Sequence, residues 1–370
     1  MKSTLLVSLL LILSFSIWAQ PSISPEKIEV IEKLLSRKMS EESIPGLSIA
    51  LVVEGKMVWS NGYGMADMEN FVPAKRNTVY RTASVGKVLT ATEAMRLVEE
   101  GKLDLDASIQ QYCPEFPEKS WPITSRHLLG HTSGIRHYGG PDHEAELLSA
   151  RHYDNIKDAL EIFKEDTLLH QPGARYTYST YGYNVLGCVM EGAAGIPFMQ
   201  IMQKYLFGPA GMPHTQVDDP YLIIPGRAAG YRRNETGKLC NAFFVDMSNK
   251  IPAGGYLTTA EDLACFAAAF MNGELLSPES VALMLEPQRT LDGDTIPYGL
   301  GWGLFPGEDW YGEREAFHGG ITPGVSTVLY LLPDRRFAVA ILMNMEGISG
   351  RVGLAAKIAK IALELSTGEK

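Results

Sequence analysis

The sequence predicts an α/β protein of the α+β type, with one antiparallel sheet built from both ends of the chain and a mostly helical lobe inserted between them. Short apolar runs typical of strands lie towards the two ends, at residues 47–53, 57–63, 298–304, 325–332 and 337–343. Residues 102–225 have the pattern of helices and loops. Strands and helices therefore do not alternate as they do in parallel βαβ folds. We expect a sheet lobe of about residues 25–80 and 225–370 and a helical lobe of about 81–224.

The first elements should be a helix and a hairpin. Ser24 is suited to cap a helix that has Pro25 at its first position, and apolar residues recur at helical spacing until Pro45-Gly46. The two strand-like runs that follow are separated by Glu54-Gly55-Lys56, which is typical of a β-hairpin.

Three later helices are expected from capping residues and periodicity: Thr82–Glu100, which Gly101 ends; Leu263–Met271, preceded by a capping box of Thr258 and Glu261; and about Val352–Leu365. The last two strands should form a hairpin, because Pro333-Asp334-Arg335 separates them.

The N-terminus has the layout of a signal peptide. Lys2 supplies a positive charge, and the apolar run Leu5–Trp18 is shorter than the roughly 20 residues of a membrane helix. We expect residues 1–19 to be removed and residues 20–370 to be periplasmic or secreted, without a stable membrane anchor. Ile17 fits the cleavage pattern poorly, so an uncleaved anchor is the alternative.

Charge and motif content exclude several classes of function. The net charge is −10, which argues against nucleic acid or an anionic membrane surface as the main partner. There is no phosphate-binding glycine loop and no G-x-S-x-G elbow, so neither a nucleotide enzyme nor a conventional α/β-hydrolase is expected. We expect no cofactor.

Neither the cysteines nor the histidines predict a metal site. The four cysteines are Cys113, Cys188, Cys240 and Cys265, which permit two disulfides. Cys188 and Cys265 lie in apolar helix-like segments, which favours buried free thiols. His127 and His131 have the i, i+4 spacing of a metal pair, but no HExxH glutamate accompanies them.

The strongest candidate for chemistry is the Ser84–Lys87 pair at a predicted helix start. Free backbone N–H groups and the helix dipole favour a developing oxyanion there, and a lysine three residues on returns to the same face. Such a lysine takes a proton only if its pKa is lowered by burial or by another cation. The alternative is a purely structural role, in which the serine caps a helix and the lysine lies on the surface. That role explains the second copy of the motif, Ser24–Lys27.

Four segments in order resemble the serine β-lactamase-like superfamily, in particular the class C branch with its related D-aminopeptidases and esterases. They are Thr82-Ala83-Ser84-Val85-Gly86-Lys87, His127-Leu128-Leu129-Gly130-His131-Thr132-Ser133-Gly134-Ile135, Ala253-Gly254-Gly255 with Thr258–Leu263, and Tyr298-Gly299-Leu300-Gly301-Trp302. The resemblance spans about residues 25–365.

The resemblance implies the remaining site residues. Tyr178 would be the tyrosine that works with Lys87 as acid and base, and Thr180 stands where the family has asparagine. Tyr153, in Tyr153-Asp154-Asn155, matches the literal pattern better, but it lies in a charged, surface-like stretch. For Tyr178 to act as a base near neutral pH, a cation must lower its pKa, and Lys87 and His318 are the candidates.

His318-Gly319-Gly320 is similar to the histidine variant of the family's third motif, in which β-lactamases have lysine. The resemblance implies that these residues bind substrate and that the backbone N–H groups of Ser84 and Ile321 form an oxyanion hole. Because histidine carries a pH-dependent charge, binding of a substrate carboxylate should weaken as pH rises. His137-Tyr138-Gly139 also fits the pattern, but it lies in a Gly/Pro-rich loop.

We therefore expect an exported serine hydrolase that cleaves an amide or ester bond of a small molecule or peptide through an acyl-enzyme on Ser84. A peptidase or esterase is favoured over a true class C-type β-lactamase, because Thr180 and His318 depart from the β-lactamase motifs. The third hypothesis is a non-catalytic penicillin- or peptide-binding protein on the same fold. The sequence leaves open the oligomeric state and whether residues 136–170 form a lid.

Overall fold

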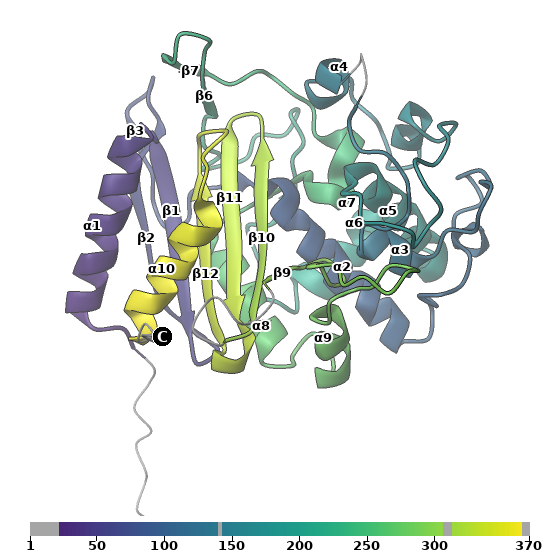
Figure 1. The fold of residues 1–370 in the computed structure, drawn as a ribbon. Coiled ribbons are helices and arrows are strands. Elements are labelled where there is room, and N and C mark those ends of the chain that lie inside the picture. Colours follow the sequence, from purple (N-terminus) through teal and green to yellow (C-terminus); the bar gives the residue numbers. More distant parts are fainter. Residues whose placement is uncertain (1–21, 140–142, 306–312, 365–370) are drawn as a thin grey trace, which may run out of the picture.

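The computed structural model describes residues 22–139, 143–305 and 313–364. Within them, seven antiparallel strands form one sheet in the order β3-β2-β1-β12-β11-β10-β9. The strands are β1 (Gly46–Val53), β2 (Lys56–Asp67), β3 (Val72–Pro73), β9 (Gly303–Phe305), β10 (Glu315–Thr322), β11 (Val325–Leu332) and β12 (Phe337–Met343). The N-terminal and C-terminal strands meet where β1 pairs with β12, with Leu47 opposite Met343. The predicted α+β architecture is confirmed (Figure 1).

Both faces of this sheet are covered by helices. The terminal helices α1 (Pro25–Glu41) and α10 (Arg351–Leu363) lie together on one face, and α8 (Ala260–Met271) packs on the other against β1 and β12 (Figure 1). All of β12 is buried, as a central strand covered on both sides should be.

The middle of the chain forms the helical lobe beside the β10 edge of the sheet (Figure 1). Its helices are α2 (Gly86–Glu99), α3 (Ser125–Leu129), α4 (His143–Leu147), α5 (Thr180–Ala194) and α6 (Phe198–Ile201). The helix α7 (Ile251–Gly254) packs on α2 and α5, although its residues fall in the range expected for the sheet lobe, and α9 (Pro278–Met284) follows α8. Short strands β4 (Tyr80–Arg81), β5 (Gln216–Val217) and β8 (Tyr256–Thr258) form a small sheet, and β6 (Tyr231–Arg233) pairs with β7 (Leu239–Asn241). The short 3-10 helix Ala83–Val85, directly before α2, lies against β10 and β11, which brings the Ser84–Lys87 pair to the junction of the two lobes.

The predicted N-cap of α1 is confirmed, and the predicted N-cap of α8 is wrong by one residue. Ser24 caps α1 by accepting from the Lys27 N–H at 3.4 Å. The capping residue of α8 is Thr259 and not Thr258, because Thr258 belongs to β8 while Thr259 accepts from the Asp262 N–H at 3.0 Å. The expected signal peptide lies outside the described residues.

The strand expected over residues 298–304 is mostly wrong, since only Gly303–Phe305 pairs regularly, as β9. A loop precedes β9, with Gly301 at a φ of +91°. The strand β10 has no apolar run to reveal it, because its centre is His318-Gly319-Gly320. Its pairing with β11, from Ala316 opposite Leu331 to Thr322 opposite Val325, decides its conformation.

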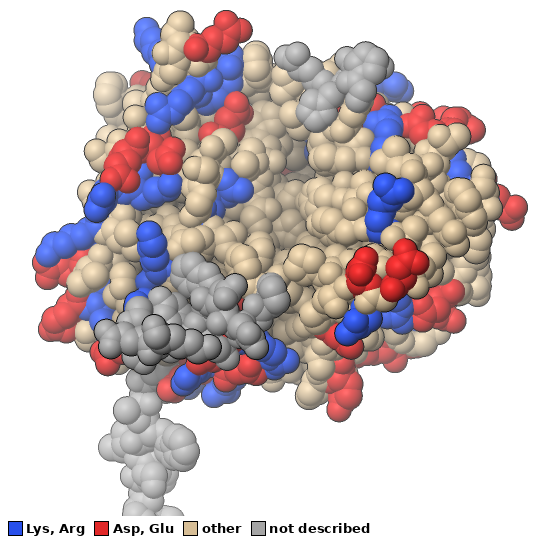
Figure 2. Space-filling view, in the orientation of Figure 1, with Lys and Arg blue, Asp and Glu red and all other residues tan. Residues whose placement is uncertain are grey.

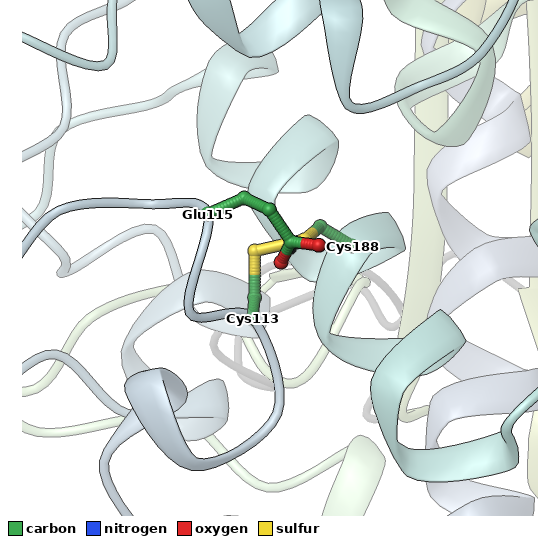
Figure 3. A group of neighbouring side chains, drawn as sticks. All are labelled: Cys113, Glu115 and Cys188. Atoms are coloured by element: carbon green, nitrogen blue, oxygen red, sulfur yellow. Dashed lines mark hydrogen bonds between the residues drawn. A yellow bond between two sulfur atoms is a disulfide. The ribbon is translucent and has the colours of Figure 1, made fainter.

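The prediction of a buried free thiol at Cys188 is wrong. Cys188, on α5, forms a disulfide with Cys113, and the carboxylate of Glu115 lies beside the two sulfurs (Figure 3). Sulfurs that are joined in a disulfide offer no thiolate ligands, so Cys113, Glu115 and Cys188 do not form a metal site in this state. Cys240 and Cys265 are free and half-buried.

Among the described helices, none alone has the length and hydropathy of a membrane span; α5 and residues 198–207 pass that test only as a pair bent by 72°.

Candidate active site

Ser84 lies in a tight turn that is hydrogen-bonded to the sheet. It belongs to a short 3-10 helix, Ala83–Val85, that leads directly into α2. Ala83 has a φ of +46°, a left-handed conformation that costs energy for a residue with a Cβ and is typical of functional turns. The Thr327 hydroxyl on β11 donates to the Thr82 carbonyl at 2.8 Å, which fixes the turn to the sheet. Ser84 itself stays partly exposed.

Lys87 lies one helical turn further on and is completely buried. Its Nζ is 3.2 Å from Ser84 Oγ, 3.3 Å from Thr180 Oγ1 and 2.9 Å from the Ala253 carbonyl oxygen. Burial lowers the pKa of the Lys87 ammonium well below its ordinary value, and the charge of Lys250 lowers it further. The amine therefore favours its neutral form, which is the form that accepts a proton from a serine hydroxyl.

Tyr178 reaches the same pair from the chain before α5. Ser179 caps α5, and Tyr178, the residue before it, places its ring centroid 5.0 Å from Lys87 Nζ. The expectation that a cation lowers the pKa of Tyr178 is wrong. Burial raises this pKa, and the interaction of the phenol with the Ser84 hydroxyl opposes the rise only in part. Tyr178 thus remains a neutral phenol that donates and accepts hydrogen bonds.

His318 is likewise uncharged, which corrects the expectation of a pH-dependent cation at this position. It is 5 % exposed. Burial, with a contribution from Lys87, lowers its pKa to about 3. Its Nδ1 lies 2.8 Å from the Gly319 carbonyl oxygen and its Nε2 3.0 Å from the Tyr298 hydroxyl.

The two glycines after His318 face opposite sides of β10. A Cβ at Gly320 would lie 2.8 Å from Ser84 N and 2.8 Å from Ala83 Cβ, so only glycine permits this close approach of strand and turn. A Cβ at Gly319 would point to the other face, 3.4 Å from Arg351 Nη2. Ile321 follows with half of its surface exposed.

The edge of β10 beside Ser84 is open. Within the described parts of the chain, β9 pairs only with Glu315–Phe317, so no strand covers His318–Thr322 on that side. The expected oxyanion-hole residues, Ser84 and Ile321, therefore lie at neighbouring points of the turn and of an accessible strand edge.

His131 is a residue of the site that sequence reasoning placed only in its neighbourhood. Its buried ring lies among three tyrosines, with centroid distances of 4.3 Å to Tyr178, 4.9 Å to Tyr298 and 5.2 Å to Tyr183. Its Nδ1 accepts from the Ser179 N–H at 3.1 Å, which fixes the chain that carries Tyr178. Burial lowers the pKa of His131 well below its usual value.

The i, i+4 pair of histidines does not share one helical face. The helix α3 ends at Leu129, and His131 has a φ of +57°. His127 instead takes part in the capping box of that helix, where its Nδ1 accepts from the Thr124 N–H at 3.2 Å. The two rings therefore have separate structural partners.

The two alternative motif residues lie in different places. Tyr153 packs under the Arg151 guanidinium, and its N–H donates to Ser248 Oγ at 2.9 Å; none of the contacts of the described residues joins it to Ser84 or Lys87. His137 does lie near the site, because its Nδ1 accepts from the Thr180 N–H at 3.2 Å. It supports the start of α5 rather than a strand.

Lys250 is a buried cation that sequence reasoning missed. Its Nζ donates to the Leu147 carbonyl at 3.3 Å and lies 5.0 Å from the ring centroid of Tyr138. Burial, together with the charge of Arg81, lowers its pKa to about 7. No sequence signal marks it except its position directly before α7, whose Ala253 carbonyl accepts from Lys87.

The chain that follows His131-Thr132-Ser133-Gly134 packs against the helical lobe next to the site. Arg136 donates to Glu146 at 2.8 Å and pairs with Asp166, and Tyr181, on α5, donates to the same glutamate at 2.8 Å. These contacts fix the ends of the segment to the base of α5.

The chain belongs to the beta-lactamase family, whose model matches residues 31–363. It is 31 % identical to the serine beta-lactamase-like protein LACTB, mitochondrial, of Mus musculus, over 91 % of this chain and 80 % of that protein. The predicted membership of the serine β-lactamase-like superfamily is confirmed.

Two solved structures show the same fold. The octameric penicillin-binding protein homologue from Pyrococcus abyssi matches with a TM-score of 0.79 at 23 % identity, over 91 % of this chain and 77 % of that one. The D-amino acid amidase from Ochrobactrum anthropi SV3, complexed with L-phenylalanine amide, matches with a TM-score of 0.76 at 22 % identity, over 92 % of this chain and 98 % of that one.

Proposed function

We propose that this protein is a serine hydrolase that cleaves an amide or ester bond through an acyl-enzyme on Ser84. The observation that carries the proposal is the 3.2 Å contact between Ser84 Oγ and the buried Lys87 Nζ, in surroundings that favour the neutral amine. Membership of the beta-lactamase family and the likeness to an amidase support it.

In the first step Ser84 Oγ attacks the substrate carbonyl carbon, and its proton passes to Lys87 Nζ. The negative charge that develops on the carbonyl oxygen is met by the backbone N–H groups of Ser84 and Ile321, a type of stabilisation worth about 10²–10³ in rate per donor. The tetrahedral intermediate then collapses, and the leaving group receives the proton from Lys87 by way of the Tyr178 hydroxyl.

In the second step a water molecule attacks the acyl-enzyme ester. Its proton passes through the Tyr178 hydroxyl to the neutral Lys87, and Ser84 leaves with a proton from the lysine. Tyr178 serves as a relay that stays neutral between transfers, because its pKa is raised. Lys87 is the base in both steps.

Among substrates, we favour esters and peptide-like amides over β-lactams. The family's asparagine is replaced by Thr180, whose Oγ1 accepts from Lys87, and the motif lysine is replaced by the neutral His318. Efficient, Ser84-dependent hydrolysis of a cephalosporin would reverse this order. A small molecule or peptide is the proposed partner, and neither nucleic acid nor a membrane anchor enters the proposal.

We also propose that the protein is exported and that residues 1–19 are removed. The support is the charged start and short apolar run of the sequence. N-terminal sequencing of protein recovered from the producing cells tests it, and an intact Met1 in the mature protein contradicts it.

The decisive test of the hydrolase is the intact mass after incubation with a fluorophosphonate probe. We expect one adduct on the wild type, mapped to Ser84, and none on Ser84→Ala. Ser24→Ala is the matched control, because Ser24–Lys27 has the same spacing but serves as a helix cap on α1. A folded wild type that forms no adduct favours the non-catalytic binding protein, and an adduct that survives Ser84→Ala refutes the assignment of the nucleophile.

A further inference from the structure

We propose that the group of the substrate that lies along β10 is uncharged, and that the hydrogen-bonded pair His318–Tyr298 enforces this choice. The inference rests on the proposed function and deepens it. It concerns the charge of the substrate where it meets the third motif, a position at which the β-lactamase motif has a lysine.

Both ring nitrogens of His318 already have partners. Nδ1 is 2.8 Å from the Gly319 carbonyl oxygen, an acceptor, so Nδ1 carries the hydrogen. Nε2 of the neutral ring is then an acceptor, and the Tyr298 hydroxyl, 3.0 Å away, donates to it. A ring held in this way has no N–H left for a substrate carboxylate.

Protonation of His318 would need a compensating negative charge, and its neighbours do not supply one. The groups that face it are Lys87 on α2, His131 after α3, Tyr178 before α5 and Tyr298 before β9. Two of these are potential cations and two are phenols, so each disfavours or fails to stabilise an imidazolium. The buried ring therefore stays neutral across the physiological pH range.

The other cations next to this edge are committed to protein partners. Arg81 pairs with Asp218 at 2.6 Å and also donates to the carbonyls of Pro323 and Val245. Arg227 donates to the Asp219 carbonyl at 2.8 Å and lies 3.9 Å from Asp218, and Lys250 is buried against the Leu147 carbonyl.

Arg351 approaches β10 from the other side. A Cβ at Gly319 would lie 3.4 Å from Arg351 Nη2, on the face of β10 that points away from Ser84, so this guanidinium does not face a substrate beside Ser84.

The surface around the end of β10 combines apolar side chains with two arginines that already have partners. Ile321 is half exposed. Beyond the β10–β11 turn, a cavity of about 250 Å³ is lined in part by Phe243 and Phe244 and also by Arg81 and Arg227. Figure 2 shows uncharged residues, in tan, over the hollow in the middle of this face. A carboxylate placed at this edge would lose water and would compete with Asp218 for the two guanidinium groups, which is unfavourable, whereas a neutral group loses little.

The test uses two aryl esters of the same N-acylglycine that differ only in the leaving group, 3-hydroxybenzoate or 3-hydroxybenzamide. The rate of hydroxide-catalysed hydrolysis of each ester corrects for its intrinsic reactivity. We expect the wild type to hydrolyse the neutral carboxamide ester with a kcat/KM at least about tenfold higher, the scale of one charge-assisted hydrogen bond.

The pH dependence of the ratio of the two kcat/KM values is measured on the wild type and on Lys250→Met, because Lys250, whose pKa is about 7, also changes its charge near the site in this range. In Lys250→Met we expect a constant ratio between about pH 5.5 and pH 8, a range above the pKa of about 4 of an ordinary carboxylic acid. If the ratio in Lys250→Met shifts in favour of the anionic ester as the pH falls, His318 gains a charge in this range and the proposal is overturned. A wild type that prefers the anionic ester at every pH overturns it as well.

Two variants sharpen the assignment. His318→Lys restores an ammonium and should shift the ratio towards the anionic ester by about tenfold or more. Tyr298→Phe removes the donor to Nε2 and should make the ratio depend on pH. An unchanged ratio in both folded variants overturns the role of the pair, and if neither variant folds, the wild-type ratio decides.

Failure of the proposed function gives a different result. If neither ester is hydrolysed, or if Ser84→Ala is as active as the wild type, the hydrolase itself is refuted and this inference falls with it. If both esters are hydrolysed only with Ser84 present and the anionic ester is preferred, the hydrolase stands and the inference alone is refuted.

Discussion

Gly320→Ala tests whether the close approach of β10 to the Ser84 turn is needed for activity. The added Cβ would lie 2.4 Å from Thr327 Oγ1, 2.8 Å from Ala83 Cβ and 2.8 Å from Ser84 N. The Thr327 hydroxyl donates a hydrogen bond to the Thr82 carbonyl, and a change of the Thr327 rotamer to make room would break that bond. The strand and the turn must therefore move apart.

The size of the effect follows from these distances. A carbon 2.8 Å from Ser84 N must move by roughly 0.7 Å to reach the ~3.5 Å of an ordinary contact. Such a movement separates the two N–H groups proposed for the oxyanion hole. Loss of one such donor, or a misplacement of about 1 Å, costs about 10²-fold, which is the expected fall in kcat/KM. Overpacking should also lower the unfolding free energy by about 1–3 kcal/mol.

The assay compares Gly320→Ala with Gly319→Ala, which adds the same methyl group on the other face, at an ordinary 3.4 Å from Arg351 Nη2. Ester hydrolysis gives kcat/KM, and urea denaturation gives the unfolding free energy. We expect the control to lose much less activity than Gly320→Ala. If the two folded variants are within about threefold of each other, the argument from the close contact is refuted.

Three further predictions concern the surroundings of the site. Lys250→Met should raise the pKa of Lys87, because it removes a like charge. The acidic limb of the pH profile of kcat/KM should therefore move to higher pH. A profile that falls in height without moving contradicts this. Thr180→Val keeps the shape but removes the oxygen 3.3 Å from Lys87 Nζ, and kcat/KM should fall about tenfold, the scale of one lost hydrogen bond; activity equal to the wild type argues against the contact. Joint replacement of Cys113 and Cys188 by Ser, which opens a covalent link across 75 residues, should lower the unfolding free energy by about 2–4 kcal/mol in denaturant titration; a midpoint that does not move contradicts a formed disulfide.

Much of the candidate site follows from the order of motifs along the chain. Ser84 and Lys87 are three residues apart, so any helix brings them together. The meeting with Tyr178, 5.0 Å from Lys87 Nζ, was anticipated only through the family resemblance, because 91 residues separate the two in the sequence. The charged stretch around Tyr153 favoured Tyr178 in the sequence; the packing of α5 against α2 places Tyr178 at Lys87.

By itself, the sequence determined the α+β architecture, the joining of the two ends in one sheet and a helix that begins near Ser84, since apolar periodicity acts locally. The left-handed Ala83 and the 3-10 turn that carries Ser84 were not predicted, because contacts with the sheet hold that turn. The tertiary structure decided the protonation of the site and the Cys113–Cys188 pairing. A pKa depends on burial and on charges from distant segments, as when Lys250 acts on Lys87 and when Tyr298 engages His318. These neighbours come together only when both lobes are folded.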